Sequence, residues 1–110
     1  MTRRRPSMLV VDDDLGSAGL LQEVFEREGY DVTVAAWGAE AVRITEERRF
    51  EIVLSDVRLP DIDGIEVLRR LKKSAPEVPV ILVTAYGTVE TAIQAMDEGA
   101  FDYVRKPFEL

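Results

Sequence analysis

The chain has 110 residues, with 14 Lys and Arg against 21 Asp and Glu and a net charge of -7 at neutral pH. That length suits one compact domain, and a hydrophobic fraction of 46% supplies enough apolar material for a core. The acidic balance argues against direct nucleic-acid binding, which depends on clustered basic side chains. Because the chain has no Cys and no His, disulfides, thiolate metal sites and imidazole catalysis are excluded.

The first residues, 1–6, are basic and are expected to form a flexible tail. The apolar run that follows, from Met8 to Val11, meets Asp12 too soon for a signal peptide or a membrane span. These features predict a cytoplasmic protein without a membrane segment.

Short apolar runs then alternate with longer amphipathic segments, which is typical of βα units. Strands are predicted at residues 8–11, 31–35, 51–55, 80–84 and 101–105, and helices at 20–28, 38–49, from 64 through 71, and 89–96. This order predicts an α/β protein with a doubly wound parallel sheet of five strands, covered on both faces. Only Phe108-Glu109-Leu110 could begin a fifth helix, so the sequence predicts that this helix is missing.

The loop after the third strand contains Pro60, Asp61 and Gly64, which favour a turn. Asp63 with Glu66 three residues later resembles a capping box at the start of the third helix.

Polar side chains follow four of the predicted strands. The first strand leads into Asp12-Asp13-Asp14, the third into Asp56, the fourth ends in Thr84, and Lys106 follows the fifth. Since the carboxyl ends of parallel strands share one edge of the sheet, these side chains should converge there. Asp14 is the exception, because we expect it to cap the first helix.

Carboxylates gathered in this way repel one another by about 3 kcal/mol per pair at ~5 Å and an effective dielectric constant of about 20. An all-oxygen site without His or Cys, formed by short loops, suits Mg²⁺ better than Ca²⁺. A cation beside a carboxylate, a hydroxyl and a lysine is what phosphoryl transfer requires, with Asp56 as the natural nucleophile.

The chain resembles the receiver domains of two-component response regulators over essentially its whole length. The matching motifs are Val10-Val11-Asp12-Asp13, Ser55-Asp56 with Pro60 and Asp63-Gly64, Val83-Thr84-Ala85, and Lys106-Pro107-Phe108. The run from Thr84 to Ile93 is most similar to receivers of the nitrogen-regulation type, which control sigma-factor-dependent transcriptional activators. The resemblance implies a flavodoxin-like fold with strand order 2-1-3-4-5, and a receiver domain at 7–110 that is truncated before or within its fifth helix.

The resemblance also implies a role for each residue at the sheet edge. Asp56 would accept a phosphoryl group from a sensor histidine kinase. Asp13 and Asp56 would bind Mg²⁺ directly with the backbone carbonyl of Arg58, and Asp12 would act mainly through water. Lys106 would pair with the phosphoryl oxygens.

Two further residues would form the switch that the resemblance implies. Thr84 would move inward on phosphorylation, Tyr103 would follow it, and the surface of the fourth helix and fifth strand would change. The domain would thus be a phosphoprotein switch for an output domain C-terminal to it, and not a dedicated enzyme, although it would catalyse its own phosphorylation and dephosphorylation. The resemblance leaves room for a homodimer and suggests a cis bond between Lys106 and Pro107.

In receivers, the residues two positions after the phosphoacceptor and after the switch threonine are thought to control hydrolytic water. Here these residues are Arg58 and Tyr86, both large, and they predict slow self-dephosphorylation. Two other readings are a phosphohydrolase with Asp56 as nucleophile and a receiver-like module that binds partners without phosphorylation. Arg58 stands where such a hydrolase would need a second Asp, and the intact set of Asp13, Asp56, Thr84 and Lys106 argues against the module.

Overall fold

A computed structural model describes residues 4–85 and 88–106. In that part of the chain, five strands alternate with four helices: β1 (Ser7–Val11), α1 (Leu15–Arg27), β2 (Asp31–Ala35), α2 (Gly38–Glu47), β3 (Ile52–Asp56), α3 (Gly64–Ser74), β4 (Val80–Thr84), α4 (Val89–Asp97) and β5 (Asp102–Arg105). The predicted alternation of strands and helices is therefore confirmed.

The strands form one parallel sheet in the order β2-β1-β3-β4-β5. Val11 pairs with Ala35 on one side and with Ser55 on the other, and Thr84 pairs with Arg105. The winding direction reverses at β1, so β1 and β3 are neighbours and their carboxyl ends lie side by side. This is the place where ligands bind in open α/β sheets.

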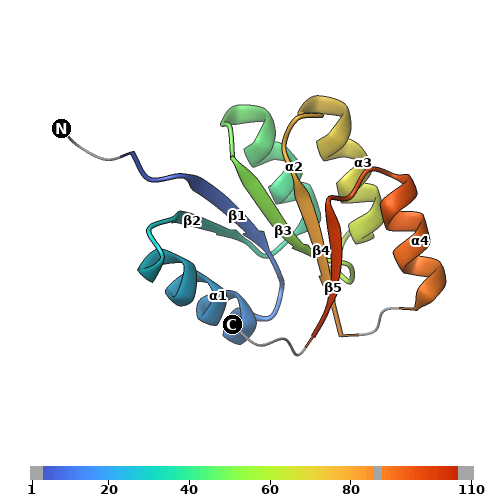
Figure 1. Ribbon diagram of the computed structural model, residues 1–110, viewed down its shortest axis with the longest axis horizontal. Coiled ribbons are helices and arrows are strands. Elements are labelled where there is room, and N and C mark those ends of the chain that lie inside the picture. Colours follow the sequence, from blue (N-terminus) through green and yellow to red (C-terminus); the bar gives the residue numbers. More distant parts are fainter. Residues whose placement is uncertain (1–3, 86–87, 107–110) are drawn as a thin grey trace.

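Two apolar layers hold the sheet between its helices. Figure 1 shows α2, α3 and α4 together on one side of the sheet and α1 on the other. The larger core joins residues of β1, β3 and β4 such as Leu9, Val53 and Leu82 to residues of α3 such as Leu68. The smaller core packs Leu21 of α1, with its neighbours, against β1, β2 and β3. The two layers follow from alternate strand residues pointing to opposite faces.

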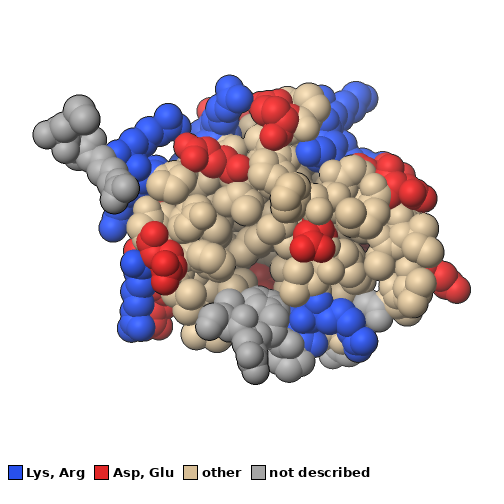
Figure 2. Space-filling model, in the orientation of Figure 1, with Lys and Arg blue, Asp and Glu red and all other residues tan. Residues whose placement is uncertain are grey.

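The face of the sheet on the α1 side is covered only over β1 and β2 by a described helix. Leu54 of β3 is buried there, while Ile81 of β4 and Val104 of β5 remain half-buried. The centre of the view in Figure 2 is largely uncharged, with acidic and basic side chains round its rim. The described residues contain four helices, and residues 107–110, where a fifth helix could begin, lie outside them.

Several boundaries differ from those the sequence predicts. Strand β3 extends through Asp56, so this carboxylate belongs to the last residue of the strand and its backbone is held in the sheet. Helix α1 starts as early as Leu15, because Asp14 caps it. Helix α2 ends at Glu47, after which Arg48 is extended and its guanidinium lies over the ring of Phe50.

The capping box predicted for α3 is only half present. The Asp63 carboxylate accepts a hydrogen bond from the Ile65 N–H at 2.7 Å, as an N-cap should. Glu66 forms ion pairs with Arg69 and Arg70. Two guanidinium partners on the same helix therefore hold the glutamate that a full capping box would use on the Asp63 N–H.

None of the helices in the described ranges is long and apolar enough to cross a bilayer.

Candidate functional site

A hollow of about 430 Å³ lies at the carboxyl edge of the sheet. Its lining contains the carboxylates and the lysine predicted at this edge, residues of the loop after β3, and one residue each from α1 and from just after β4. The lining residues are Asp12, Asp13, Asp14, Ser17, Asp56, Arg58, Leu59, Pro60, Ala85 and Lys106. The predicted convergence of carboxylates and a lysine at this edge is therefore present, and we call this hollow the acidic pocket.

Asp12 forms the buried floor of the acidic pocket, with only 2% of its surface exposed. Its backbone N–H continues the ladder to the Ala35 carbonyl beyond the end of β1. One carboxylate oxygen accepts from the Asp14 N–H at 3.0 Å, and the other accepts from the Lys106 ammonium at 2.9 Å. Both oxygens of this buried carboxylate therefore already have donors within the protein.

Asp56 stands opposite Asp12 at the end of the neighbouring strand. Its Oδ1 accepts from the Arg58 N–H at 2.9 Å and its Oδ2 accepts from Lys106 Nζ at 3.1 Å. Its side chain remains 13% exposed and opens into the pocket. A partly accessible carboxylate held by two donors is suited to attack on an electrophile that enters from solvent.

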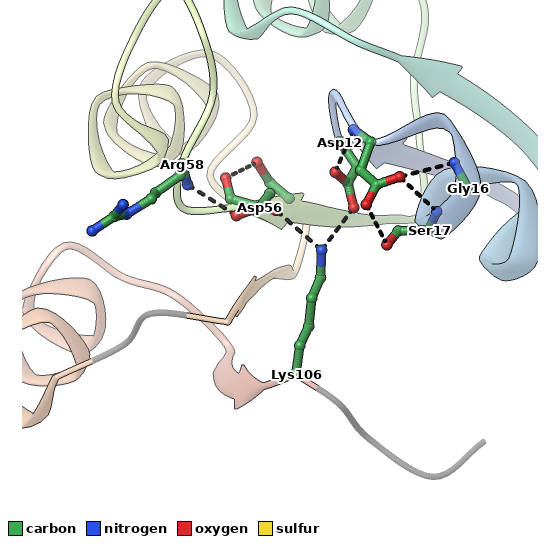
Figure 3. Close-up of polar contacts among 8 residues, drawn as sticks. Asp12, Gly16, Ser17, Asp56, Arg58 and Lys106 are labelled. Atoms are coloured by element: carbon green, nitrogen blue, oxygen red, sulfur yellow. Dashed lines mark hydrogen bonds and ion pairs between the residues drawn. The ribbon is translucent and has the colours of Figure 1, made fainter.

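Lys106 bridges the two carboxylates from the end of β5, as Figure 3 shows. Its backbone N–H donates to the Thr84 carbonyl at 2.7 Å, which fixes the start of the side chain beside β4. Burial by itself would lower the pKa of the ammonium, but hydrogen bonds to Asp12 and Asp56 outweigh it and raise the pKa above 10.5. Lys106 is therefore a permanent cation at neutral pH.

Asp13 presents an exposed carboxylate beside these two. Oxygens of Asp12, Asp13 and Asp56 all lie within 4.8 Å of one another. The negative charge of these three carboxylates exceeds the single positive charge of the Lys106 ammonium. Oxygen donors are also the ligands that hard divalent cations prefer. The residues present thus fit a Mg²⁺ ion.

Asp14 caps α1, as the sequence predicted. Its Oδ1 accepts from the N–H groups of Gly16 and Ser17, and the Ser17 hydroxyl donates to Oδ2. The backbone N–H groups of Ser17 and Gly16 hold the pKa of Asp14 below its ordinary value of 3.8. Its carboxylate lines the acidic pocket but serves the helix.

Thr84 does not line the acidic pocket in this structure. It is buried at the end of β4 and borders a second hollow of about 580 Å³ between the loop after β3 and helix α4. The other lining residues of that hollow include Thr88, Thr91 and Gln94 of α4 and its N-cap. Thr84 thus lies between the acidic pocket and the helix expected to respond to it.

Tyr103 lies on the same face of the sheet as Thr84. Tyr103 pairs with Leu82, and Thr84 comes two residues after Leu82 on β4. The side chains of Tyr103 and Thr84 therefore point to the same side of the sheet at neighbouring positions. The Tyr103 hydroxyl is buried and has no hydrogen-bond partner among the described residues, and this burial raises its pKa above 10.0.

Two sequence predictions, the role of Tyr86 and the cis bond to Pro107, concern residues outside the described ranges.

The sequence predicts Asp61 only as part of a turn, yet its carboxylate accepts from the N–H groups of Gly38 and Ala39 at the start of α2. A carboxylate in a loop gives no local signal for a partner more than 20 residues away. The one hint is that Trp37, just before α2, cannot cap a helix with its own side chain.

A doubly wound five-stranded sheet with this acidic pocket defines a CheY-like α/β domain. The chain belongs to the family of response regulator receiver domains, whose family model matches residues 8–110. Receiver domains of this family are the phosphorylation switches of two-component response regulators.

Individual relatives agree with this assignment. The transcriptional regulatory protein ZraR of Escherichia coli O157:H7 is 42% identical over 110 residues, which are 100% of this chain and 25% of ZraR. A CheY-like receiver domain protein from Methanospirillum hungatei JF-1 superposes with a TM-score of 0.94 at 33% identity, covering 96% of this chain and 85% of that one. The beryllofluoride-activated NtrC4 receiver domain dimer superposes with a TM-score of 0.89 at 35% identity, covering 94% of this chain and 85% of that one. The resemblance to nitrogen-regulation-type receivers is thus confirmed, and the chain spans about a quarter of the length of the curated relatives that it matches first.

Proposed function

We propose that this receiver domain takes a phosphoryl group from the phosphohistidine of a sensor histidine kinase onto Asp56. A carboxylate oxygen of Asp56 forms a bond to phosphorus while the phosphorus–nitrogen bond breaks, and the departing imidazole takes a proton from water. The observation that carries this proposal is the partly exposed Asp56 carboxylate, held by the Arg58 N–H and the Lys106 ammonium. Those two donors orient the nucleophile before the phosphoryl group arrives.

Lys106 has a second task in this mechanism. Its Nζ lies 2.9 Å from Asp12 and 3.1 Å from Asp56, so it can exchange the Asp56 oxygen for a phosphoryl oxygen with a small movement. Because its pKa is raised, it delivers a full positive charge to the oxygens of the transferring group.

The carboxylate cluster supports Mg²⁺ as the cofactor. We assign Asp13, Asp56 and the Arg58 backbone carbonyl as direct ligands, and the more deeply buried Asp12 as a ligand through water. When bound, the ion neutralises negative charge on the phosphoryl oxygens.

Thr84 and Tyr103 carry the signal onward in this proposal. Thr84 moves from the hollow beside α4 toward the phosphoryl group, and Tyr103, on the same face of the sheet, follows. The Tyr103 hydroxyl, which has no hydrogen-bond partner within residues 4–85 and 88–106, favours a second position, because a buried hydroxyl without a partner costs about 1–3 kcal/mol. The surface formed by α4 and β5 changes as a result.

The remaining parts of the proposal concern the parent protein. The output domain follows this domain in a longer chain and is a transcriptional activator, by analogy with ZraR, of which this chain spans 25%. The domain acts in the cytoplasm, is not a dedicated enzyme, and contacts no nucleic acid itself, which its net charge of -7 supports. A homodimer is supported by the dimer of the NtrC4 receiver.

The test is incubation with a small phosphodonor and Mg²⁺, followed by intact mass measurement. The wild type should gain one phosphoryl group, Asp56→Asn should gain none, and the control Asp97→Asn, at the exposed end of α4, should behave as the wild type. Continuous release of phosphate without an adduct would instead indicate a phosphohydrolase. An unmodified wild type would indicate a module that works without phosphorylation.

The phosphoryl group should hydrolyse slowly, because Arg58, a large residue two positions after Asp56, lies at the acidic pocket. Arg58→Asn opens the approach to water and should shorten the phosphoryl lifetime several-fold, measured as the decay of the adduct mass after the donor is removed. Tyr86→Ala should act in the same direction. A wild-type lifetime shorter than that of either variant contradicts the expectation.

A further inference from the structure

Helix α2 is capped by a residue from a different loop. Trp37, at its N-cap position, makes no side-chain capping bond. The carboxylate of Asp61 takes that role from the loop after β3, with Oδ1 accepting from the Gly38 N–H at 2.8 Å and Oδ2 from the Ala39 N–H at 2.9 Å. A carboxylate shared by two N–H groups at the positive end of a helix is a directional tether between two segments.

Close packing reinforces this tether. A Cβ atom at Gly38 would lie 2.5 Å from Ile62 Cγ1 and 2.9 Å from Val67 Cγ2, so only glycine lets the loop approach α2 this closely. The Ala39 N–H, followed by that of Gly38, also outweighs desolvation and holds the pKa of Asp61 below 3.8. Asp61 is therefore ionised at neutral pH.

The loop that Asp61 tethers also carries the Arg58 backbone carbonyl, the main-chain ligand of the proposed cation site. At its base, the Gly64 N–H donates to the Val57 carbonyl at 2.8 Å, and the Arg58 N–H donates to Asp56 at 2.9 Å. At its tip, Asp61 is held on α2. The peptide that bears the Arg58 carbonyl lies between these fixed points, so its orientation depends on both.

We propose that Asp61 is a positioning residue for the divalent cation, holding the tip of the loop on α2 so that the Arg58 carbonyl faces the carboxylate cluster. This inference rests on the proposed function, in which that carbonyl is a direct ligand. An untethered loop would still carry Arg58, but it would lose free energy on ordering its carbonyl each time the ion binds.

The test titrates the purified domain with Mg²⁺ alone and follows backbone amide chemical shifts in the acidic pocket. Asp61→Ala should raise the Mg²⁺ dissociation constant about tenfold, which is typical of losing an outer partner of a metal ligand. Asp61→Asn should have a Mg²⁺ dissociation constant between those of Asp61→Ala and the wild type, because its single amide oxygen can replace only one of the two carboxylate oxygens that accept hydrogen bonds. The control is Thr88→Ala, which removes the N-cap of α4 and should leave Mg²⁺ affinity unchanged.

A second readout separates positioning from chemistry. With a small phosphodonor, Asp61→Ala should need more Mg²⁺ for half-maximal phosphorylation, while its rate at saturating Mg²⁺ should return to that of the wild type. Equal Mg²⁺ affinity in wild type and Asp61→Ala, with loss of stability alone, overturns the inference and leaves the proposed function intact. Failure of the wild type to bind Mg²⁺ overturns both.

Discussion

Gly64→Ala should lower the free energy of unfolding by about 3 kcal/mol, at the upper end of what overpacking usually costs. A Cβ atom there would lie 2.6 Å from the Asp56 carbonyl oxygen, 2.6 Å from Val57 Cα and 2.7 Å from the Val57 oxygen. All three are backbone atoms, of the last residue of β3 and of the residue after it, so no side-chain rotation can relieve the clash. Urea unfolding followed by circular dichroism measures the loss.

Gly19→Ala is the matched control for this substitution. Gly19 lies within α1, and a Cβ atom there meets nothing within 4 Å. Alanine should therefore stabilise the domain by about 1 kcal/mol through helix propensity alone. Equal effects of the two substitutions would show that the start of α3 does not press on the end of β3.

The displaced backbone in Gly64→Ala has a functional consequence too. Since the clash falls on the peptide of Asp56 itself, the variant should also be phosphorylated more slowly by a small donor under conditions where it remains folded. A folded variant with an unchanged rate would show that the strand end yields without moving the carboxylate.

Lys106→Met should destabilise the domain in the absence of Mg²⁺ by about 2 kcal/mol. The substitution leaves the Asp12 carboxylate, whose side chain is 3% exposed, beside Asp56 without its ammonium partner. Breaking a fully buried pair costs about 3–5 kcal/mol, and the open pocket reduces that cost here. Chemical unfolding with and without Mg²⁺ measures the effect.

The response of this variant to Mg²⁺ is the more specific result. Without the ammonium, the carboxylates should bind the ion more tightly, so Mg²⁺ should restore more stability to Lys106→Met than it adds to the wild type. Phosphorylation should remain impaired, because the ammonium that meets the phosphoryl oxygens in the proposed mechanism is gone. Lys73→Met, on the exposed face of α3, is the control and should change neither quantity. A variant as stable as the wild type without Mg²⁺ would contradict the expectation.

The order of strands and helices could be read from the sequence because each element carries its own signal. Buried parallel strands such as β4 are continuous apolar runs, and helices such as α4 carry apolar residues at helical spacing. Boundaries were less accurate where a contact outside the segment decides them. Strand β3 reaches Asp56 because β4 offers a pairing partner, and α1 starts early because Asp14 caps it.

Most of the acidic pocket was also predictable, since the residue types after parallel strands meet at one edge regardless of the details of packing. Asp12, Asp13, Asp56 and Lys106 were all found in this way. Thr84 borders the hollow beside α4, and its inward movement on phosphorylation stays a prediction.

The fold class, the carboxylates and lysine of the pocket, and the Asp14 cap could be predicted from the amino-acid sequence, because strand patterning, residue chemistry and local capping act over a few residues. The folded chain was needed to show that Lys106 bridges Asp12 and Asp56 across 94 and 50 positions of sequence, and that Asp61 caps a helix 23 positions earlier. Such contacts depend on how two segments approach in space. For Asp61, the approach requires the absence of a side chain at Gly38.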